Sequence, residues 1–123
     1  MKNILIGSDI ALIGDFADFQ IERSIDTGLK DLIGSSSFNI YDLELPLTDS
    51  ENAIRKTGPN LKMNPRMIDV IKTLKPGLLV TANNHIVDYG LKGLNDTEKI
   101  LIDNNVPYIG SGTDAIEAFF HLN

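Results

Sequence analysis

Residues 77–93 read GLLVTANNHIVDYGLKG. In this stretch a short apolar run leads directly into a group of polar residues. The run at 77–80 has the length and composition of a buried strand. Ligands of open α/β sheets bind where the chain leaves the carboxyl ends of the strands. Two amides, an imidazole and a carboxylate follow this strand, so the segment is the first candidate for a functional site.

The residue types in this segment suggest separate chemical roles. Asn84 can offer a carbonyl oxygen to a hard cation, and His85 can donate a proton to a leaving group. Asp88 follows three residues later and could hold the second ring nitrogen of His85 if the segment turns helically. The structural alternative is an Asx turn at Asn83 and Asn84, a half-buried His85 that only packs, and Asp88 as the cap of the next helix.

Strand-like and helix-like segments alternate along the rest of the chain. Apolar residues recur at helical spacing in residues 19–33, and Asn64 before Pro65 is typical of a helix start. Strands joined by helices run parallel, with right-handed crossovers. The order βαβαβαβα therefore predicts an α/β fold with a mainly parallel sheet. We expect strands at 2–8, 38–43, 78–82 and 107–109, and helices at 19–33, 65–75, 91–105 and 113–120.

Acidic residues follow the first two predicted strands. Asp9 ends the first, whereas Asp42 and Glu44 end the second and point to one face, because side chains alternate along a strand. Parallel strands bring these ends to one edge of the sheet, where carboxylates repel one another unless a cation lies between them. The alternatives are that Asp9 caps a turn and that Asp42 and Glu44 form a solvated strand end.

The segment at 48–62 lacks apolar periodicity and is rich in turn-forming residues. Loops beside a site often contact the substrate. Arg55 and Lys56 could therefore bind an anionic phosphate or carboxylate. The alternative is a solvated surface loop without a role in binding.

Composition excludes several classes of function. The 123 residues suit a single domain, and a formal net charge of −6 argues against nucleic acid or an anionic membrane as a partner. The absence of cysteine excludes disulfides and thiolate metal ligands. The amino-terminal apolar stretch is too short for a signal peptide or a membrane span. This favours a cytoplasmic location, or an exported or anchored one if an anchor has been removed.

Three blocks of this sequence resemble the capsule-synthesis, poly-γ-glutamate-synthesis (CapA-type) proteins, whose domains are similar to calcineurin-type metallophosphatases. The blocks are GSDI at 7–10, DLELPLT at 42–48, and residues 82–97, with ANNH at 82–85, DYG at 88–90 and DT at 96–97. The third block is highly specific, the second fairly specific and the first weak alone. The family usually has Gly-Asp where this chain has an intervening Ser8, and Asn where it has Asp42.

The resemblance implies that residues 1–123 form a single metallophosphatase-like domain, one half of a layered α/β sandwich that is incomplete at its carboxyl end. It also implies a divalent metal, and manganese, magnesium, iron and zinc all suit oxygen-rich ligands. The resemblance implies Glu44 and Asn84 as metal ligands and His85 as the catalytic acid. The shared strand edge adds Asp9 to the expected metal ligands, and the spacing to His85 adds Asp88 to the expected catalytic residues.

Two functions agree with this resemblance. One is metal-dependent phosphoester hydrolysis, with Asn83, Arg55 and Lys56 contacting an anionic small-molecule or polymer substrate. The other is a non-catalytic accessory subunit of a polymer synthesis or export complex. An open edge of the sheet with apolar surface invites pairing with another chain, so we expect self-association or partner subunits.

Overall fold

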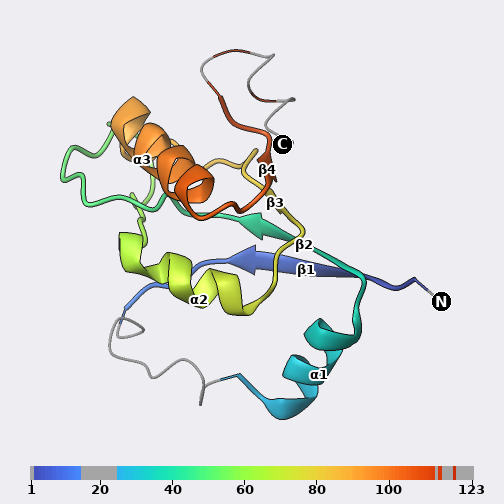
Figure 1. Cartoon of the computed structure of the whole chain (residues 1–123). Helices are drawn as coiled ribbons and strands as arrows, with labels where there is room; N and C mark the ends of the chain where they lie inside the picture. The colour runs from blue at the N-terminus through green and yellow to red at the C-terminus, as the bar shows by residue number, and fades with distance from the viewer. Residues whose placement is uncertain (1, 15–24, 113, 115–117, 119–123) are drawn as a thin grey trace.

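The fold is an α/β arrangement built on one four-stranded sheet in which all strands run parallel (Figure 1). The computed structural model describes residues 2–14, 25–112, 114 and 118. The strands are β1 (Ile4–Ile10), β2 (Phe38–Leu43), β3 (Leu78–Val80) and β4 (Tyr108–Ile109), side by side in sequence order. The predicted fold class and every predicted strand are confirmed; both ends of β2 agree, and the ends of the other strands differ by at most two residues.

Helices connect these strands. They are α1 (Thr27–Ser35), a 3₁₀ turn η3 (Pro65–Met67) that leads into α2 (Ile68–Thr73), and α3 (Gly90–Asp103). As predicted, the Asn64 side chain accepts a hydrogen bond from the Arg66 backbone and so begins the second helical segment. No described helix is both long and apolar enough to cross a membrane. The helix predicted at 113–120 falls mostly outside the described residues.

The first helix begins later than its apolar spacing predicted. Asp26 has an extended backbone, with φ −52° and ψ 143°, and its side chain accepts hydrogen bonds from the N–H groups of Gly28 and Leu29. A side chain can cap amide groups in this way only at the start of a helix. The prediction is therefore wrong for residues 25 and 26, and its part at 19–24 lies outside the described residues.

Helices α2 and α3 lie on one face of the sheet, and the hydrophobic core fills the space between (Figure 1). Side chains alternate along β2, so Asn39, Tyr41 and Leu43 face this core. The segment that follows β2 is buried as well, and this fixes the strand end from which Asp42 and Glu44 project. Core side chains with no exposed surface are Leu43, Leu45, Leu47, Met63, Ile71, Leu79 and Leu101.

The opposite face of the sheet is not covered by any described helix (Figure 1). On β1, Ile4 and Ile6 are 64% and 75% exposed, and Phe38 at the start of β2 is 43% exposed. Parallel sheets are normally buried on both faces. The uncovered face is therefore the feature of this fold that favours contact with another protein surface.

Gly110, directly after β4, allows the chain to pass very close to the end of β3. Its φ is +111°, and a Cβ placed there would lie 2.7 Å from the Cβ of Ala82 and 2.8 Å from its backbone nitrogen. The neighbouring Thr81 donates its backbone N–H to Ile109 at 2.8 Å and its hydroxyl to Ser111 at 2.8 Å. This close approach fixes the backbone that leads into Asn83.

Substitution of Gly110 should destabilise the fold through two effects, backbone strain and a steric clash. A substitution of Gly58 should show the first effect alone. Gly58 also has a positive φ, +94°, but nothing lies within 4 Å of a Cβ placed there. We expect Gly58→Ala to cost about 1 kcal/mol from backbone strain alone. Gly110→Ala should cost roughly 2–4 kcal/mol, because the clash adds to the strain. Urea denaturation of both variants measures the free energy of unfolding. An equal loss of stability in the two variants would contradict the close approach of Gly110 to Ala82.

Self-association should depend on the uncovered face of the sheet. Sedimentation at tens of micromolar should show a species larger than the monomer, and the double variant Ile4→Ser/Ile6→Ser should reduce it, because these side chains supply exposed apolar surface. Leu91→Ser is the matched control, since Leu91 is 66% exposed on α3. A wild-type protein that stays monomeric and unfolds cooperatively would refute the expectation.

Candidate functional site

An irregularity in β1 places Asp9 beside Asp42. Ile6 pairs with Ile40, whereas Asp9 pairs with Asp42, so β1 advances by three residues where β2 advances by two. This is a β-bulge, which redirects the side chains that follow it. The sequence has Ser8 before Asp9, one residue more than the Gly-Asp pattern that it resembles. The bulge accommodates this extra residue and keeps the aspartate at the strand end.

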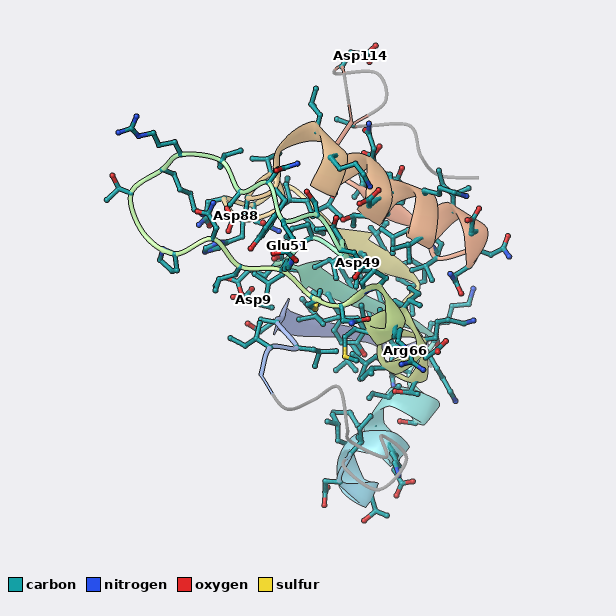
Figure 2. The ribbon with its side chains drawn as sticks, turned by 90° about the vertical axis from the view of Figure 1, so that its left-hand side faces the viewer. Asp9, Asp49, Glu51, Arg66, Asp88 and Asp114 are labelled. Carbon is teal, nitrogen blue, oxygen red and sulfur yellow. The ribbon has the colours of Figure 1, made fainter. Side chains whose placement is uncertain are left out.

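Asp9, Asp42 and Glu44 converge at the carboxyl ends of β1 and β2, as predicted. Burial raises the pKa of Asp42 above its ordinary value, and the charges of Asp9 and Glu44 raise it further, although a hydrogen bond from Asn83 partly opposes the shift. The nearby like charges therefore disfavour the ionised form of Asp42. Figure 2 looks onto this end of the sheet, where both Asp9 and Asp88 are labelled.

The predicted metal ligands are only partly grouped. Asp9 and Glu44 belong to the carboxylate cluster, whereas Asn84 is an exposed residue in the turn after β3. Within the described part of the chain, no three or more His, Cys, Asp or Glu side chains are placed to hold a metal together. A ligand role for Asp9, Glu44 and Asn84 therefore stays a prediction.

Asn83 ties the turn after β3 to the end of β2. Its Nδ2 donates to the carbonyl oxygen of Leu43 at 2.8 Å and to the carboxylate of Asp42 at 3.2 Å. Its Oδ1 accepts hydrogen bonds from the backbone N–H groups of His85 and Ile86, both at 3.0 Å. The Asx-turn alternative is thus realised at Asn83, while a contact between Asn83 and substrate stays a prediction.

The predicted contact between His85 and Asp88 is present. Nδ1 of His85 lies 2.7 Å from Oδ2 of Asp88, and the backbone turns because the N–H of Asp88 donates to the carbonyl oxygen of His85 at 2.9 Å. Helix α3 begins after Tyr89 without a side-chain cap. The alternative that Asp88 caps this helix is therefore wrong, because its carboxylate faces the imidazole.

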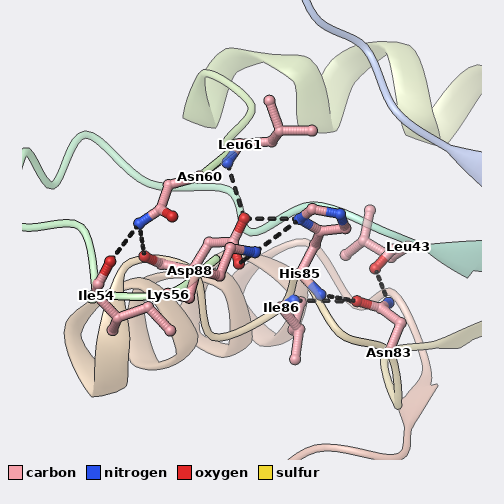
Figure 3. A network of polar contacts seen from close by, with 9 residues as sticks. All are labelled: Leu43, Ile54, Lys56, Asn60, Leu61, Asn83, His85, Ile86 and Asp88. Atoms are coloured by element: carbon pink, nitrogen blue, oxygen red, sulfur yellow. Dashed lines mark hydrogen bonds and ion pairs between the residues drawn. The ribbon is translucent and has the colours of Figure 1, made fainter. Parts of the chain in front are cut away.

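The loop at 48–62 supplies further partners of the buried Asp88 carboxylate (Figure 3). Nζ of Lys56 forms an ion pair with Oδ1 of Asp88 and lies 3.3 Å from Nδ1 of His85. The backbone N–H of Leu61 donates to Oδ2 of Asp88 at 2.8 Å. The side chain of Asp88 is 0% exposed and that of Lys56 only 19%, so this ion pair is largely shielded from water.

The same loop is also held by the backbone of Asp88. The carbonyl oxygen of Asp88 accepts hydrogen bonds from the N–H of Ile54 at 2.9 Å and from Nδ2 of Asn60 at 3.2 Å. Nδ2 of Asn60 also donates to the carbonyl oxygen of Ile54 at 2.7 Å. Residues 54–61 are therefore fixed against the turn that carries the imidazole (Figure 3).

Asp88 is an ionised carboxylate in its buried position. Burial alone would raise its pKa, but hydrogen bonds from His85, Lys56 and the Leu61 backbone, together with the charge of Lys56, hold it below the ordinary value. A lowered folded-state pKa contributes stability above the unfolded-state pKa of about 3.9. That contribution is lost as the pH falls through the lower pKa of the folded state.

The two basic residues of the loop that were predicted to contact an anionic substrate differ in position. Arg55 is exposed, whereas Lys56 turns inward to Asp88. Sequence reasoning missed the roles of Asn60 and Leu61. A possible signal was Gly58 and the proline after it, which favour a turn that returns the loop toward the sheet. Substrate contacts by Arg55 and Lys56 stay predictions.

Helix α3 holds the segment after β2 in place. Oγ1 of Thr97 accepts a hydrogen bond from the N–H of Leu47 at 2.9 Å, and Thr48 Oγ1 donates to Asp96 Oδ2 at 2.5 Å. A Cβ on Gly93 would lie 3.5 Å from Thr48 and 2.8 Å from Tyr89 Cβ, so this glycine permits the close packing. The second and third sequence blocks are therefore in direct contact.

Known proteins resemble this chain over most of its length. Residues 8–122 match the family described as bacterial capsule synthesis protein PGA_cap. A probable polyglutamine synthesis accessory protein of Mycobacterium tuberculosis (strain CDC 1551 / Oshkosh) is 35% identical over 80 residues, which are 64% of this chain. The PGA biosynthesis protein CapA of Bacillus subtilis (strain 168) is 27% identical over 91 residues, or 73% of this chain.

These relatives are much longer than the chain described above. The matched residues span 21% of the mycobacterial protein and 24% of the Bacillus protein. The family match, in contrast, includes residues 8–10 of the first sequence block, the whole of the second and third blocks, and the loop that surrounds Asp88. The chain therefore belongs to the bacterial capsule synthesis protein PGA_cap family.

Proposed function

We propose that this chain carries a metal-dependent phosphoester-hydrolysing site of a protein that acts in poly-γ-glutamate capsule synthesis. The observation that carries the proposal is the position of Asn83. Its side chain hydrogen bonds to Asp42 in the carboxylate cluster and to the backbone of His85. A cluster that attracts cations is therefore held next to a group that can transfer protons.

A hard divalent cation fits the donors of the carboxylate cluster. Asp9 and Glu44 raise the pKa of Asp42 by their negative charge, and a cation among these groups would offset that repulsion. Magnesium and similar ions often bind through one or two carboxylates and keep several waters, so a complete set of protein ligands is not required. Asn84 would add a neutral oxygen. When bound, the cation would stabilise charge that develops on a phosphoryl group.

His85 is suited to proton transfer in this site. Asp88 holds its Nδ1, so Nε2 on the other edge of the ring remains to exchange a proton with the leaving oxygen of a substrate. The exposed Arg55 could attract an anionic small molecule or polymer toward this edge. The residues proposed to act are Asp9, Glu44 and Asn84 on the cation, and His85 with Asp88 in proton transfer.

A second candidate is a non-catalytic accessory subunit of a polymer synthesis complex. The name of the mycobacterial relative, a probable polyglutamine synthesis accessory protein, favours it. The uncovered apolar face of the sheet would then serve as a contact for partner subunits. Under this alternative the His85–Asp88 contact and its loop would serve to stabilise the fold.

Metal binding should raise the thermal stability of the protein. Titration of metal-free protein with manganese or magnesium should raise the melting temperature by several degrees, because a ligand that binds only the folded state stabilises it. Glu44→Gln should abolish the rise. Glu51→Gln is the matched control, since Glu51 is 88% exposed and pairs with Lys62 on the surface. If no divalent ion shifts the melting temperature of the wild type, the metal proposal fails.

Hydrolysis should require His85. With manganese present, the protein should hydrolyse a chromogenic phosphomonoester or phosphodiester, and His85→Asn should reduce turnover about a hundredfold or more, because general acid–base groups contribute that much. Circular dichroism would check that the variant is folded. Turnover that survives in folded His85→Asn would come from a contaminant, and metal binding without turnover would support the accessory role.

A further inference from the structure

Lys56 lies against the His85–Asp88 pair, although it comes from the loop at 48–62 and not from the segment that carries these residues. Its Nζ pairs with Oδ1 of Asp88 and is 3.3 Å from Nδ1 of His85. Its side chain is 19% exposed, so the ammonium group is turned away from bulk water. This placement calls for an explanation beyond that of a surface lysine.

The charge of Asp88 requires a positive partner. Its carboxylate is 0% exposed, and a buried charge is costly unless it is paired and hydrogen-bonded. The backbone N–H of Leu61 and the ring of His85 supply hydrogen bonds to Oδ2, but neither supplies a full charge while the imidazole is neutral. Lys56 supplies that charge at Oδ1.

The distances also locate the proton of a neutral His85 ring. Nδ1 and Asp88 Oδ2 are 2.7 Å apart, which is a hydrogen-bond distance and requires a proton between them. Asp88 also pairs with the ammonium of Lys56 and accepts from the N–H of Leu61, which are the partners of a carboxylate, so that proton lies on Nδ1. Nδ1 then has no lone pair to accept from Lys56, so the lysine donates to Asp88 alone and Nε2 keeps the free lone pair.

We propose that Lys56 is a positioning residue for His85: by balancing the charge of Asp88 it keeps the ring proton on Nδ1 and leaves Nε2 free for proton exchange. The inference rests on the proposed function of His85. It gives Lys56 a role other than contact with substrate. The loop contacts of Ile54, Asn60 and Leu61 with Asp88 hold the lysine in this place.

Nitrogen-15 spectra of the imidazole side chains test the proposal without any catalytic assay. The chain has two histidines, so the variant His121→Gln assigns the signals of His85. In the wild-type chain at a pH well above the ordinary histidine pKa of about 6.5, the shifts should report a protonated Nδ1 and an unprotonated Nε2. A ring that carries its proton on Nε2 would overturn the proposal.

Removal of the lysine charge should move the proton. In Lys56→Met the population with Nε2 protonated should rise, and Lys56→Arg should restore the wild-type form, because it keeps the charge. Lys62→Met is the matched control, since Lys62 pairs with Glu51 and does not contact Asp88. Lys56→Gln replaces the Met variant if the latter does not fold. An unchanged tautomer in a folded neutral variant would overturn the role of Lys56.

Kinetics on the same variants separate positioning from substrate binding. Lys56→Met should lower kcat about tenfold or more with little change in KM, because groups that orient a functional side chain typically contribute that much. A rise in KM at constant kcat would instead assign Lys56 to substrate binding and overturn the proposal. If the tautomer moves as expected but the wild type has no turnover, the positioning role stands and the proposed hydrolysis fails.

Discussion

The buried carboxylate of Asp88 is the group on which the arrangement of the candidate site depends. With 0% of its side chain exposed, it must be compensated by hydrogen bonds and an opposite charge. Its partners come from two parts of the chain: His85 from the turn after β3, and Lys56 with Leu61 from the loop at 48–62. The hydrogen bonds and the ion pair of the Asp88 carboxylate thus orient the imidazole and hold the loop against it.

Two carboxylates of the site have environments that shift their pKa values in opposite directions. Burial and the like charges of Asp9 and Glu44 raise the pKa of Asp42, whereas Asp88 has donors around it that lower its pKa despite burial. Groups whose environments separate their pKa values in this way are typical of sites that combine different chemical roles. Asp88 is paired with Lys56 and His85, whereas Asp42 accepts a hydrogen bond from Asn83 and lies near the negative charges of Asp9 and Glu44. A cation is therefore proposed at the cluster of Asp9, Asp42 and Glu44 and not at Asp88.

The sequence could predict features that depend on local periodicity and spacing. Helical spacing and strand-like runs predicted the α/β order, and the i,i+3 spacing of His85 and Asp88 sufficed to predict their contact. Features that depend on long-range packing could not be predicted. The bulge that places Asp9 beside Asp42 follows from pairing with a distant strand, and the inward turn of Lys56 follows from the charge of a buried residue 32 positions away. The late start of α1 is a local exception, because Asp26 acts as a cap.

The carboxylate cluster and the uncovered face of the sheet belong to the same surface. Side chains alternate along β2 and beyond its end, so Asp42 and Glu44 point to the side opposite buried Leu43, the side on which Ile4 and Ile6 are exposed. A protein surface that covered these isoleucines would also remove water from the ends of β1 and β2. The pKa of Asp42 would then rise further, because desolvation and repulsion both disfavour its ionised form. Covering the face and binding a cation would therefore be coupled, since the cation is what would keep the covered carboxylates charged.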